Sequence, residues 1–459
     1  MHIKGFVPWY VVMASTKRLT LRVTRKTPEL LCPAVSTPNE FKYLSDIDDQ
    51  SFLRSYAASI NFYKKNPSME GKDPVKIIRE AIAKALVFYY PLAGRLREHT
   101  GRKLVVECTG QGVMFAEADA DATLQHFGED ALYPPFPNLD DISLEMPNNL
   151  GIWGDIPLMF IQVTRLKCGG FIFSNNFNHT VCDGVGLSQF LSAVGELARG
   201  ASSPSIRPVW ERHLLMAPQP PCVSFAHREY DASTSGGTLV PLDVMEERSF
   251  YFSSAEISAL RRSLPPHLQR CSKFEIVAGC TWRCQTIAIS PKPDEEIRFS
   301  VFIDNRKIMK PRLPIGYYGN VIVFPVVVTT AGELSKNPLH YAVELVRKAK
   351  REVVTDEYLR SVASLMVMRD RPSMTEANTY VVSNMTHVGF EQMDVGWGTA
   401  EYGGMSKGIY RPTGKIQIAW YSPFKDGFVV PVSLPLESMK VFENKLQVMM
   451  TTAPKPSSL

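Results

Sequence analysis

The sequence predicts a mixed α/β or α+β protein of two domains, and three observations lead to this prediction. Its 459 residues are about three times the ~150 residues of one typical domain. Strand-like and helix-like segments alternate in both halves of the chain, as they do in mixed folds. Between the halves, residues 204–238 are rich in proline, serine and glycine and lack regular periodicity. We therefore expect domains at 15–203 and 239–459, joined by a crossover loop at 204–238.

The first half is predicted to contain strands, a helix, a hairpin and a second helix. Asp73 suits the N-cap position, and Pro74 suits the first helical position because its missing N–H would be unpaired there. This helix ends at Tyr90, since the residue before Pro91 avoids helical geometry. From apolar periodicity we predict strands over 19–23, 103–107, 158–166 and 171–177, and helices over 74–90 and 185–199.

The second half shows the same mixture of periodicities. Ser253 or Ser254 is a candidate N-cap for its first helix. Proline residues punctuate a long loop over 304–320, and a glycine-flanked tryptophan marks another loop over 394–398. We predict strands over 248–252, 298–303, 380–385, 416–420 and 428–432, and helices over 253–263, 273–288 and 339–353.

Charge and composition exclude several classes of protein. The net charge is only +5, and no block of lysine or arginine accompanies it, so we expect no nucleic-acid partner. No segment has the ~18–20 apolar residues of a membrane span. Residues 5–14 have the length of a signal-peptide core, but Pro8 interrupts them, so we expect an irregular extension with Met13 as a second candidate start. The eight cysteines form no Cys-x-x-Cys pair and no zinc spacing, which predicts reduced thiols and no metal site.

The end of the chain bears on the compartment. Ser457-Ser458-Leu459 resembles the Ser-Lys-Leu peroxisomal signal, with serine at the middle position. Free thiols are also typical of proteins outside the secretory route. We expect a protein of the cytoplasm or the peroxisome, with the peroxisomal import receptor as a partner in the second case.

One short segment could carry chemistry. Neither a nucleotide-binding glycine loop nor a Gly-x-Ser-x-Gly or His-Glu-x-x-His motif is present. His179 and Asp183 instead lie between a predicted strand and a predicted helix, and Gly184 would allow close approach of a ligand. A histidine pKa near ~6.5 suits proton abstraction. A buried structural histidine beside an aspartate explains the same spacing, so both interpretations remain open on spacing alone.

Four sequence stretches together resemble one family. Residues 179–184, His-Thr-Val-Cys-Asp-Gly, match the His-x-x-x-Asp-Gly motif of the plant BAHD acyl-CoA-dependent acyltransferases. Residues 394–398, Asp-Val-Gly-Trp-Gly, resemble its Asp-Phe-Gly-Trp-Gly signature, with Val395 in place of phenylalanine. The stretches Tyr-Pro-Leu-Ala-Gly-Arg at 90–95 and Asp-Asn-Arg through Gly-Asn at 304–320 agree as well. The order and spacing also match, and the resemblance covers the chain from about Thr20.

The resemblance implies both a fold and a reaction. The fold would be α/β, with two chloramphenicol-acetyltransferase-like domains and a solvent channel between them. Acyl-CoA would enter from one face as a co-substrate and an alcohol from the other. His179 would take the hydroxyl proton, and a tetrahedral intermediate would collapse to the ester and CoA. No metal, cofactor or covalent enzyme intermediate is implied, and we expect a monomer.

The resemblance also assigns site residues. His179 and Asp183 would form the catalytic motif, with the Asp183 carboxylate turned away from the ring and paired with Arg306. Gly184, Asp394 and Trp397 would give structural support. The candidates for oxyanion or acceptor contacts are Ser383, Asn384 and Thr386. The candidates for binding CoA are Ser272, Lys273, Lys310 and Arg312, although their interpretation as solvated surface groups is preferred for each of the four.

Within the family, residues 44–50 and the sequence His-Thr-Val-Cys-Asp-Gly resemble the alcohol acyltransferase branch. The leading expectation is transfer of a benzoyl group from benzoyl-CoA to benzyl alcohol. Transfer of acetyl or medium-chain acyl groups to aliphatic alcohols is the alternative, followed by N-acylation of amines. A catalytically silent interaction protein of the same fold is an alternative of another class, and the presence of His179 and Asp183 argues against it.

Overall fold

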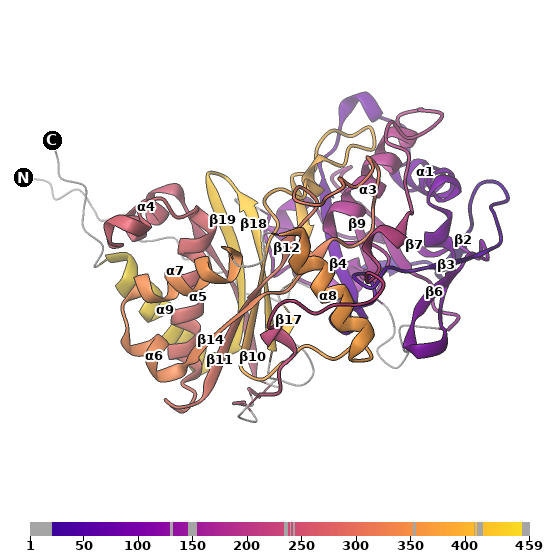
Figure 1. Ribbon diagram of the computed structural model, residues 1–459. Helices are drawn as coiled ribbons and strands as arrows, with labels where there is room; N and C mark the ends of the chain where they lie inside the picture. The colour runs from indigo at the N-terminus through magenta and orange to yellow at the C-terminus, as the bar shows by residue number, and fades with distance from the viewer. Residues whose placement is uncertain are drawn as a thin grey trace, which may run out of the picture.

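The computed structural model describes residues 21–128, 132–145, 154–233, 237–238, 240–241, 244–351, 355–407, 409–410 and 416–451. The segment at 5–14 and the tail at 457–459 lie outside these ranges, as do residues 19–20 of the first predicted strand. Within the described part of the chain, two seven-stranded sheets face each other near the middle of the molecule (Figure 1).

The first sheet is built mainly from the first half of the chain. Its strands follow the order β1-β7-β8-β9-β4-β16, with β2 also paired to β7. The predicted hairpin is present, because β8 and β9 run antiparallel and are joined by the turn at 167–170. The strands are β1 (Val23–Arg25), β2 (Glu29–Leu31), β4 (Tyr56–Tyr63), β7 (Val113–Ala120), β8 (Met159–Leu166), β9 (Phe171–Asn178) and β16 (Tyr402–Met405).

The second sheet comes from the second half of the chain. Its order is β10-β19-β18-β15-β11-β14, with β17 paired to β18. Strands β11, β15 and β18 are mutually parallel, and the other pairs are antiparallel. The strands are β10 (Met245–Phe252), β11 (Glu296–Val301), β14 (Val326–Thr330), β15 (Thr379–Asn384), β17 (Ile409–Tyr410), β18 (Ile416–Phe424) and β19 (Gly427–Pro435). There are also two smaller sheets. One has three strands in the order β3 (Phe41–Tyr43), β6 (Leu104–Glu107) and β5 (Arg95–Glu98), and the other pairs β12 (Ile303–Asp304) with β13 (Ile322–Val323).

Strand β16 links the two halves. It lies in the second half of the sequence but pairs antiparallel with β4 of the first sheet, with Tyr402 opposite Phe62 and Met405 opposite Ser59. The sequence did not predict this connection, because strand pairing between distant segments leaves no local pattern. The division into 15–203, 204–238 and 239–459 stays a prediction, to which the structure adds this shared strand.

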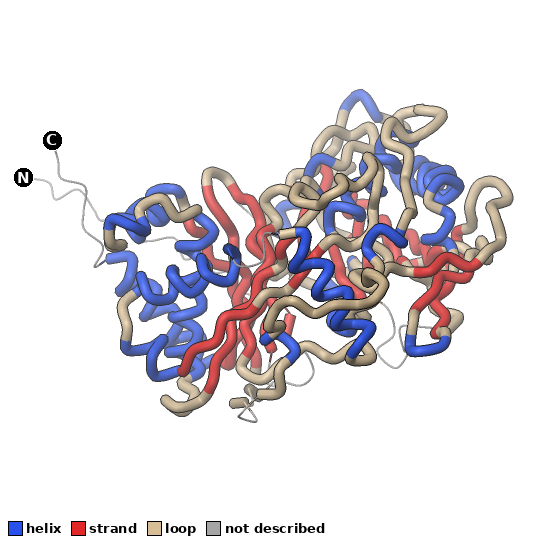
Figure 2. Tube along the Cα trace, viewed as in Figure 1, coloured by secondary structure: helices blue, strands red, loops and turns tan. Residues whose placement is uncertain are grey.

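Helices cover the outer faces of both sheets (Figures 1 and 2). Asp73 caps α1 as predicted, since its carboxylate accepts a hydrogen bond from the N–H of Val75 at 3.2 Å. Helices α4 to α7 and α9 gather on the side of the second sheet that faces away from the first. The helices are α1 (Pro74–Phe88), α2 (Leu139–Ile142), α3 (Gly184–Ala198), α4 (Ser254–Arg262), α5 (Lys273–Ile289), α6 (Ala331–Lys336), α7 (Leu339–Arg351), α8 (Asp356–Met368) and α9 (Leu436–Thr451). None of those in the described ranges is long and apolar enough to cross a membrane.

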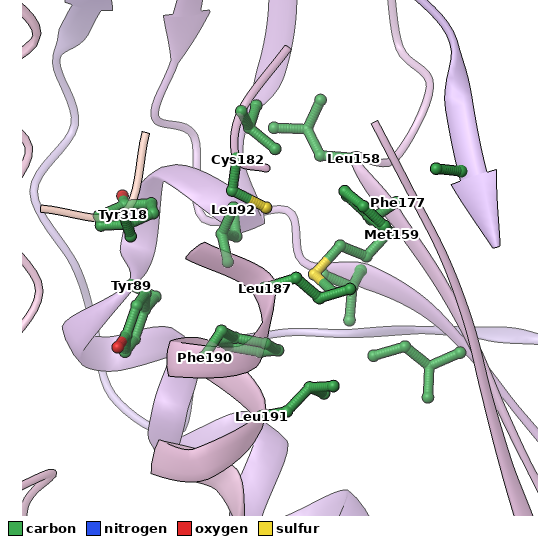
Figure 3. Close-up of a cluster of buried hydrophobic side chains, with 14 of the residues drawn as sticks. Tyr89, Leu92, Leu158, Met159, Phe177, Cys182, Leu187, Phe190, Leu191 and Tyr318 are labelled. Atoms are coloured by element: carbon green, nitrogen blue, oxygen red, sulfur yellow. The ribbon is translucent and has the colours of Figure 1, made fainter. Parts of the chain in front are cut away.

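The largest core lies behind the turn between β9 and α3. Figure 3 shows Leu187, Phe190 and Leu191 of α3 packed among side chains of the first sheet and the end of α1. The rings of Phe190 and Tyr89 meet edge to face, with centroids 5.2 Å apart. Close packing of this kind resists displacement, so the core fixes the position of the turn that follows β9.

Candidate active site

The residues of the first motif form a tight turn between β9 and α3. Asn178 ends the strand, and its side-chain oxygen accepts hydrogen bonds from the N–H and hydroxyl of Thr180 at 3.1 and 2.7 Å. Asp183 caps the helix by accepting a hydrogen bond from the N–H of Gly186 at 3.0 Å. A Cβ atom on Gly186 would lie 2.0 Å from the carbonyl oxygen of Tyr318, so only glycine fits there. The turn is therefore held from both ends, with His179 inside it.

His179 borders a cavity between the two sheets. The cavity holds about 630 Å³, counting the part that is open to solvent. The first sheet and α3 supply Ala57, Phe177, His179, Asp183, Gly184, Val185 and Met405. The second half supplies Phe302, Asp304, Arg306, Ile322, Ser383, Asn384, Met385, Val388, Phe390 and Trp420. The wall is mostly apolar and rich in aromatic rings.

Asn320 orients the His179 ring. Its Nδ2 group donates to Asp48 Oδ1 at 2.9 Å and to the carbonyl oxygens of His179 and Thr180 at 2.9 and 3.3 Å. The amide nitrogen is thus turned toward three oxygens, and Oδ1 is turned toward His179 Nδ1 at 3.2 Å. An amide oxygen only accepts hydrogen bonds. Nδ1 therefore holds the ring hydrogen, and Nε2 keeps a lone pair that can accept a proton.

Burial keeps this histidine neutral. The side chain is only 9% exposed, and burial lowers the pKa of His179 below its ordinary value. The carboxylates of Asp183 and Asp48 and the hydrogen bond with Asn320 act in the opposite direction and offset part of this effect. At neutral pH the ring is thus in the form that a general base requires.

A buried ion pair holds Asn320 in turn. Asp48 is fully buried, and its Oδ1 accepts hydrogen bonds from the N–H of Asn320 at 2.8 Å and from Arg212 Nη1 at 2.9 Å. Arg212 is 1% exposed and also donates to the carbonyl oxygen of Val181 at 2.8 Å. The sequence interpretation missed the roles of Asp48, Asn320 and Arg212, because the contacts join positions far apart in the chain.

Asp48 belongs to a cluster of buried charges. Asp46 pairs with Lys103 at 2.6 Å and with Arg371 at 3.2 Å. Asp49 pairs with Arg371 at 2.7 Å and also with Arg54. Three aspartates within four residues are unusual for a buried segment unless each is paired, which is the signal that could have indicated this cluster. It joins the first half, the crossover and the second half beside the His179 turn.

Asp183 points away from the histidine ring, as predicted. Its two oxygens accept hydrogen bonds from Arg306 Nη1 and Nη2 at 2.7 and 2.8 Å. Oδ2 also accepts from the N–H of Val321 at 3.1 Å. Among the described residues, no hydrogen bond joins the carboxylate to the His179 ring. The geometry is that of a bidentate ion pair that fastens the turn to the loop at 304–320.

The structure separates the three oxyanion or acceptor candidates. Ser383 and Asn384 border the cavity, whereas Thr386 does not. Asn384 Oδ1 accepts hydrogen bonds from the N–H and hydroxyl of Thr386 at 3.2 and 2.7 Å. Thr386 thus closes a local turn and does not border the cavity. Its role as a donor to substrate stays a prediction.

The second signature lies far from His179. Asp394 Oδ1 accepts hydrogen bonds from the N–H groups of Gly396 and Gly398 at 2.7 and 2.8 Å, which closes the loop. The Trp397 ring packs edge to face on Phe171, with centroids 5.3 Å apart. Phe171 begins β9 and His179 follows its end, so about 26 Å separates them at ~3.3 Å per residue. Val395, which stands where the family signature has phenylalanine, is fully buried and packs in the core.

The CoA candidates occupy two places. Ser272 caps α5, and Lys273 Nζ donates to Ser254 Oγ at 2.8 Å and to the carbonyl oxygen of Asp426 at 3.2 Å. Lys310 and Arg312 are exposed in the loop at 304–320, beside α8, where Arg360 donates to the carbonyl oxygen of Lys310. CoA binding by these residues stays a prediction. Within the described ranges, no group of three or more His, Cys, Asp or Glu residues could hold a metal ion.

Two mixed sheets with a strand-to-helix histidine turn at their junction define the class of two-domain, chloramphenicol-acetyltransferase-like α/β proteins. The crystal structure of vinorine synthase has this fold: it matches 93% of this chain and 98% of its own with a TM-score of 0.71, at 20% identity. The prediction of an α/β fold with two chloramphenicol-acetyltransferase-like domains is confirmed.

Sequence comparison identifies the family. The model of the Transferase family matches residues 21–449. Benzyl alcohol O-benzoyltransferase of Petunia hybrida is 52% identical over 441 residues, which are 95% of each chain. Alcohol acyl transferase 1, allele GSa, of Malus domestica is 46% identical over 439 residues, 93% of this chain and 94% of its own. The chain belongs to this family, the BAHD acyltransferases, and is an acyl-CoA-dependent O-acyltransferase.

Proposed function

We propose that this enzyme transfers a benzoyl group from benzoyl-CoA to benzyl alcohol. The observation that supports this proposal most strongly is the aromatic wall of the cavity, where four rings border the same space as His179. Rings in edge or offset contact contribute ~0.5–1.5 kcal/mol beyond burial of their area, which favours aromatic substrates. The similarity to the Petunia enzyme points the same way. The four rings belong to Phe177, Phe302, Phe390 and Trp420.

In the proposed mechanism, His179 is the general base. Its Nε2 accepts the hydroxyl proton while the alcohol oxygen attacks the thioester carbon. The C–S bond then breaks, and the imidazolium returns the proton to the CoA thiolate. Asn320 keeps Nδ1 protonated throughout, and the nearby Asp48 and Asp183 carboxylates stabilise the transient positive charge. Alignment of both substrates in a channel between the sheets would supply much of the remaining acceleration.

The pH dependence of the rate follows from this assignment. The base must be neutral, and burial lowers the pKa of His179 below its ordinary value of about 6.5. We therefore expect kcat/KM to fall only on the acid side, with a midpoint below pH ~6.5, and to be constant from neutral pH to about pH 8. Rates measured across this range with one acyl-CoA and one alcohol test this directly. A midpoint above pH ~7 would contradict a neutral, buried base.

A substrate panel tests the proposed specificity. Release of free CoA thiol would be measured with benzoyl-, acetyl- and hexanoyl-CoA against benzyl alcohol, 1-hexanol and benzylamine. We expect the highest kcat/KM for benzoyl-CoA with benzyl alcohol. The variant Phe302→Leu, assayed with the same panel, should show a smaller preference for benzoyl-CoA over acetyl-CoA, because the substitution removes one ring of the wall. A wild-type preference for aliphatic acyl groups would contradict the proposal.

Transfer of acetyl or medium-chain acyl groups to aliphatic alcohols is the second candidate. Met385 and Met405 also border the cavity, and their unbranched, flexible side chains adapt to linear chains. The similarity to the Malus domestica enzyme favours this candidate as well. The same substrate panel distinguishes the two candidates by the acyl-CoA that gives the higher kcat/KM.

We further propose a monomeric enzyme of the cytoplasm or the peroxisome. The resemblance of Ser457-Ser458-Leu459 to a peroxisomal signal supports the second compartment. In that compartment the import receptor would be a protein partner.

A further inference from the structure

Two residues of the cavity wall, Trp420 and Arg306, each have a buried nitrogen donor that is unpaired among the described residues; the Arg306 guanidinium also binds two carboxylates, whereas the indole has a single donor. The indole Nε1 of Trp420 is buried and has no hydrogen-bond partner among the described residues. The side chain is 5% exposed, and the residue borders the cavity that holds His179. Leaving a buried donor unpaired costs ~1–3 kcal/mol, and more than nine-tenths of buried polar groups avoid this cost. An unpaired donor at a substrate cavity indicates that its partner is part of the substrate.

Ser383 lies next to this donor. In the parallel pair of β15 and β18, Ser383 is directly opposite Trp420. Their side chains therefore project from the same face of the sheet, from strands ~4.8 Å apart. Ser383 is 7% exposed, and in the part of the chain that the structure describes its hydroxyl donates only to the sulfur of Met385 at 3.3 Å, a weak acceptor. Within the described ranges, an unpaired indole N–H and a hydroxyl that donates only to a weak acceptor thus lie side by side on the wall from the second sheet.

The other polar groups of this wall are at least partly engaged, although Nε of Arg306 is also unpaired among the described residues. The Asn384 side-chain oxygen accepts both hydrogen bonds of the Thr386 turn. Arg306 binds Asp304 at 3.0 Å and Asp183 at 2.7 Å. The ring of Trp420 is packed against Phe302, with centroids 5.7 Å apart, so its position is fixed before substrate binds. Preorganised donors in an apolar cavity are what a developing negative charge requires.

We propose that the Trp420 indole N–H and the Ser383 hydroxyl together bind the carbonyl oxygen of the acyl group. As the alcohol oxygen forms its bond to the carbonyl carbon, the C=O π pair moves onto this oxygen. The two donors stabilise the resulting oxyanion until the pair returns and the C–S bond breaks. The alcohol proton passes through His179 to the departing thiolate. This inference deepens the proposed function and rests on its acyl-transfer mechanism, but it does not depend on which acyl group is used.

The test removes the N–H and keeps the shape of the ring. Trp420→3-benzothienylalanine replaces the N–H by sulfur, and the same replacement at Trp282 is the matched control. Trp282 is a buried residue of α5 whose ring packs against Phe299 at 5.2 Å, and it does not border the cavity. We expect kcat to fall about 10²-fold for the Trp420 variant, with little change in the KM for acyl-CoA. The Trp282 variant should keep the wild-type kcat.

Each assay would use the acyl-CoA and alcohol that the wild-type enzyme turns over fastest. If the proposed benzoyl specificity is wrong, the substrate panel with the wild-type enzyme will show it. The ratio of the variant kcat to the wild-type kcat can still be measured with whichever substrates the enzyme prefers. Trp420→Phe is a second variant that also lacks the donor, and a similar fall in kcat is expected. An unchanged kcat at position 420, a rise in KM alone, or an equal loss in the Trp282 variant would overturn the proposal.

Discussion

His179→Ala is expected to lower kcat by at least ~10²-fold while the protein stays folded. Removal of a positioned general base usually costs 10²–10⁴-fold. The ring donates a hydrogen bond to Asn320, a single neutral contact whose loss should not unfold the protein. The turn around it is held independently by Asp183 and Asn178. Steady-state rates of the purified variant, together with its thermal unfolding midpoint, test this expectation.

The matched control is His213→Ala. His213 is exposed and lies away from the cavity wall, so its removal should leave kcat unchanged. If the folded His179→Ala enzyme retained more than about a tenth of the wild-type rate, the loss would be far smaller than the usual cost of removing a general base. The assignment of His179 as the base would then be wrong.

The second large effect is expected from the ion pair of Asp183 and Arg306. The side chains are 3% and 16% exposed, and each carboxylate oxygen accepts one of the two arginine hydrogen bonds. Breaking a buried pair leaves an uncompensated charge and costs ~3–5 kcal/mol. Asp183→Ala and Arg306→Ala should therefore both lower the thermal midpoint strongly. Activity should be lost indirectly, because the turn that aims His179 is released.

Asp183→Asn separates support of the turn from proton transfer. The single amide oxygen can still accept one of the hydrogen bonds from the N–H groups of Gly186 and Val321, which go to different oxygens of the carboxylate, so partial activity is expected. The pH midpoint should move to a lower pH, because the Asp183 charge no longer raises the pKa of His179. The exposed pair of Lys440 and Glu437 is the matched control, and Lys440→Ala should leave the thermal midpoint unchanged. A stable but fully inactive Asp183→Asn enzyme would instead assign the carboxylate a direct part in catalysis.

Local sequence signals were enough to predict much of the fold. The α1 helix was predicted from its cap at Asp73 and its proline boundaries, and the hairpin of β8 and β9 from two apolar runs joined by a glycine turn. Strand β4 was missed because residues 59–63 are buried on both faces, so most of the strand shows no alternation. The place of β16 beside β4 depends on a pairing across more than 300 residues. No local pattern records such a pairing.

The same limit applies to the site. His179, Asp183 and the contact with Arg306 could be predicted because a family motif preserves their order. Asn320 lies in a stretch that also resembles the family, yet its role depends on three-dimensional contacts with His179 and Asp48. The unpaired Trp420 N–H is a property of packing. Such features follow from the folded structure and have no signature in residue spacing.

The central claim is that His179 Nε2 accepts the alcohol proton while Asn320 holds Nδ1. The most direct measurement is a crystal structure with benzyl alcohol and an inert acyl-CoA analogue, in which a methylene group replaces the thioester sulfur. We expect the alcohol oxygen within ~2.6–3.2 Å of Nε2, and Asn320 Oδ1 still bonded to Nδ1. An alcohol bound away from Nε2, or a ring turned so that Nδ1 faces the alcohol, would contradict the mechanism.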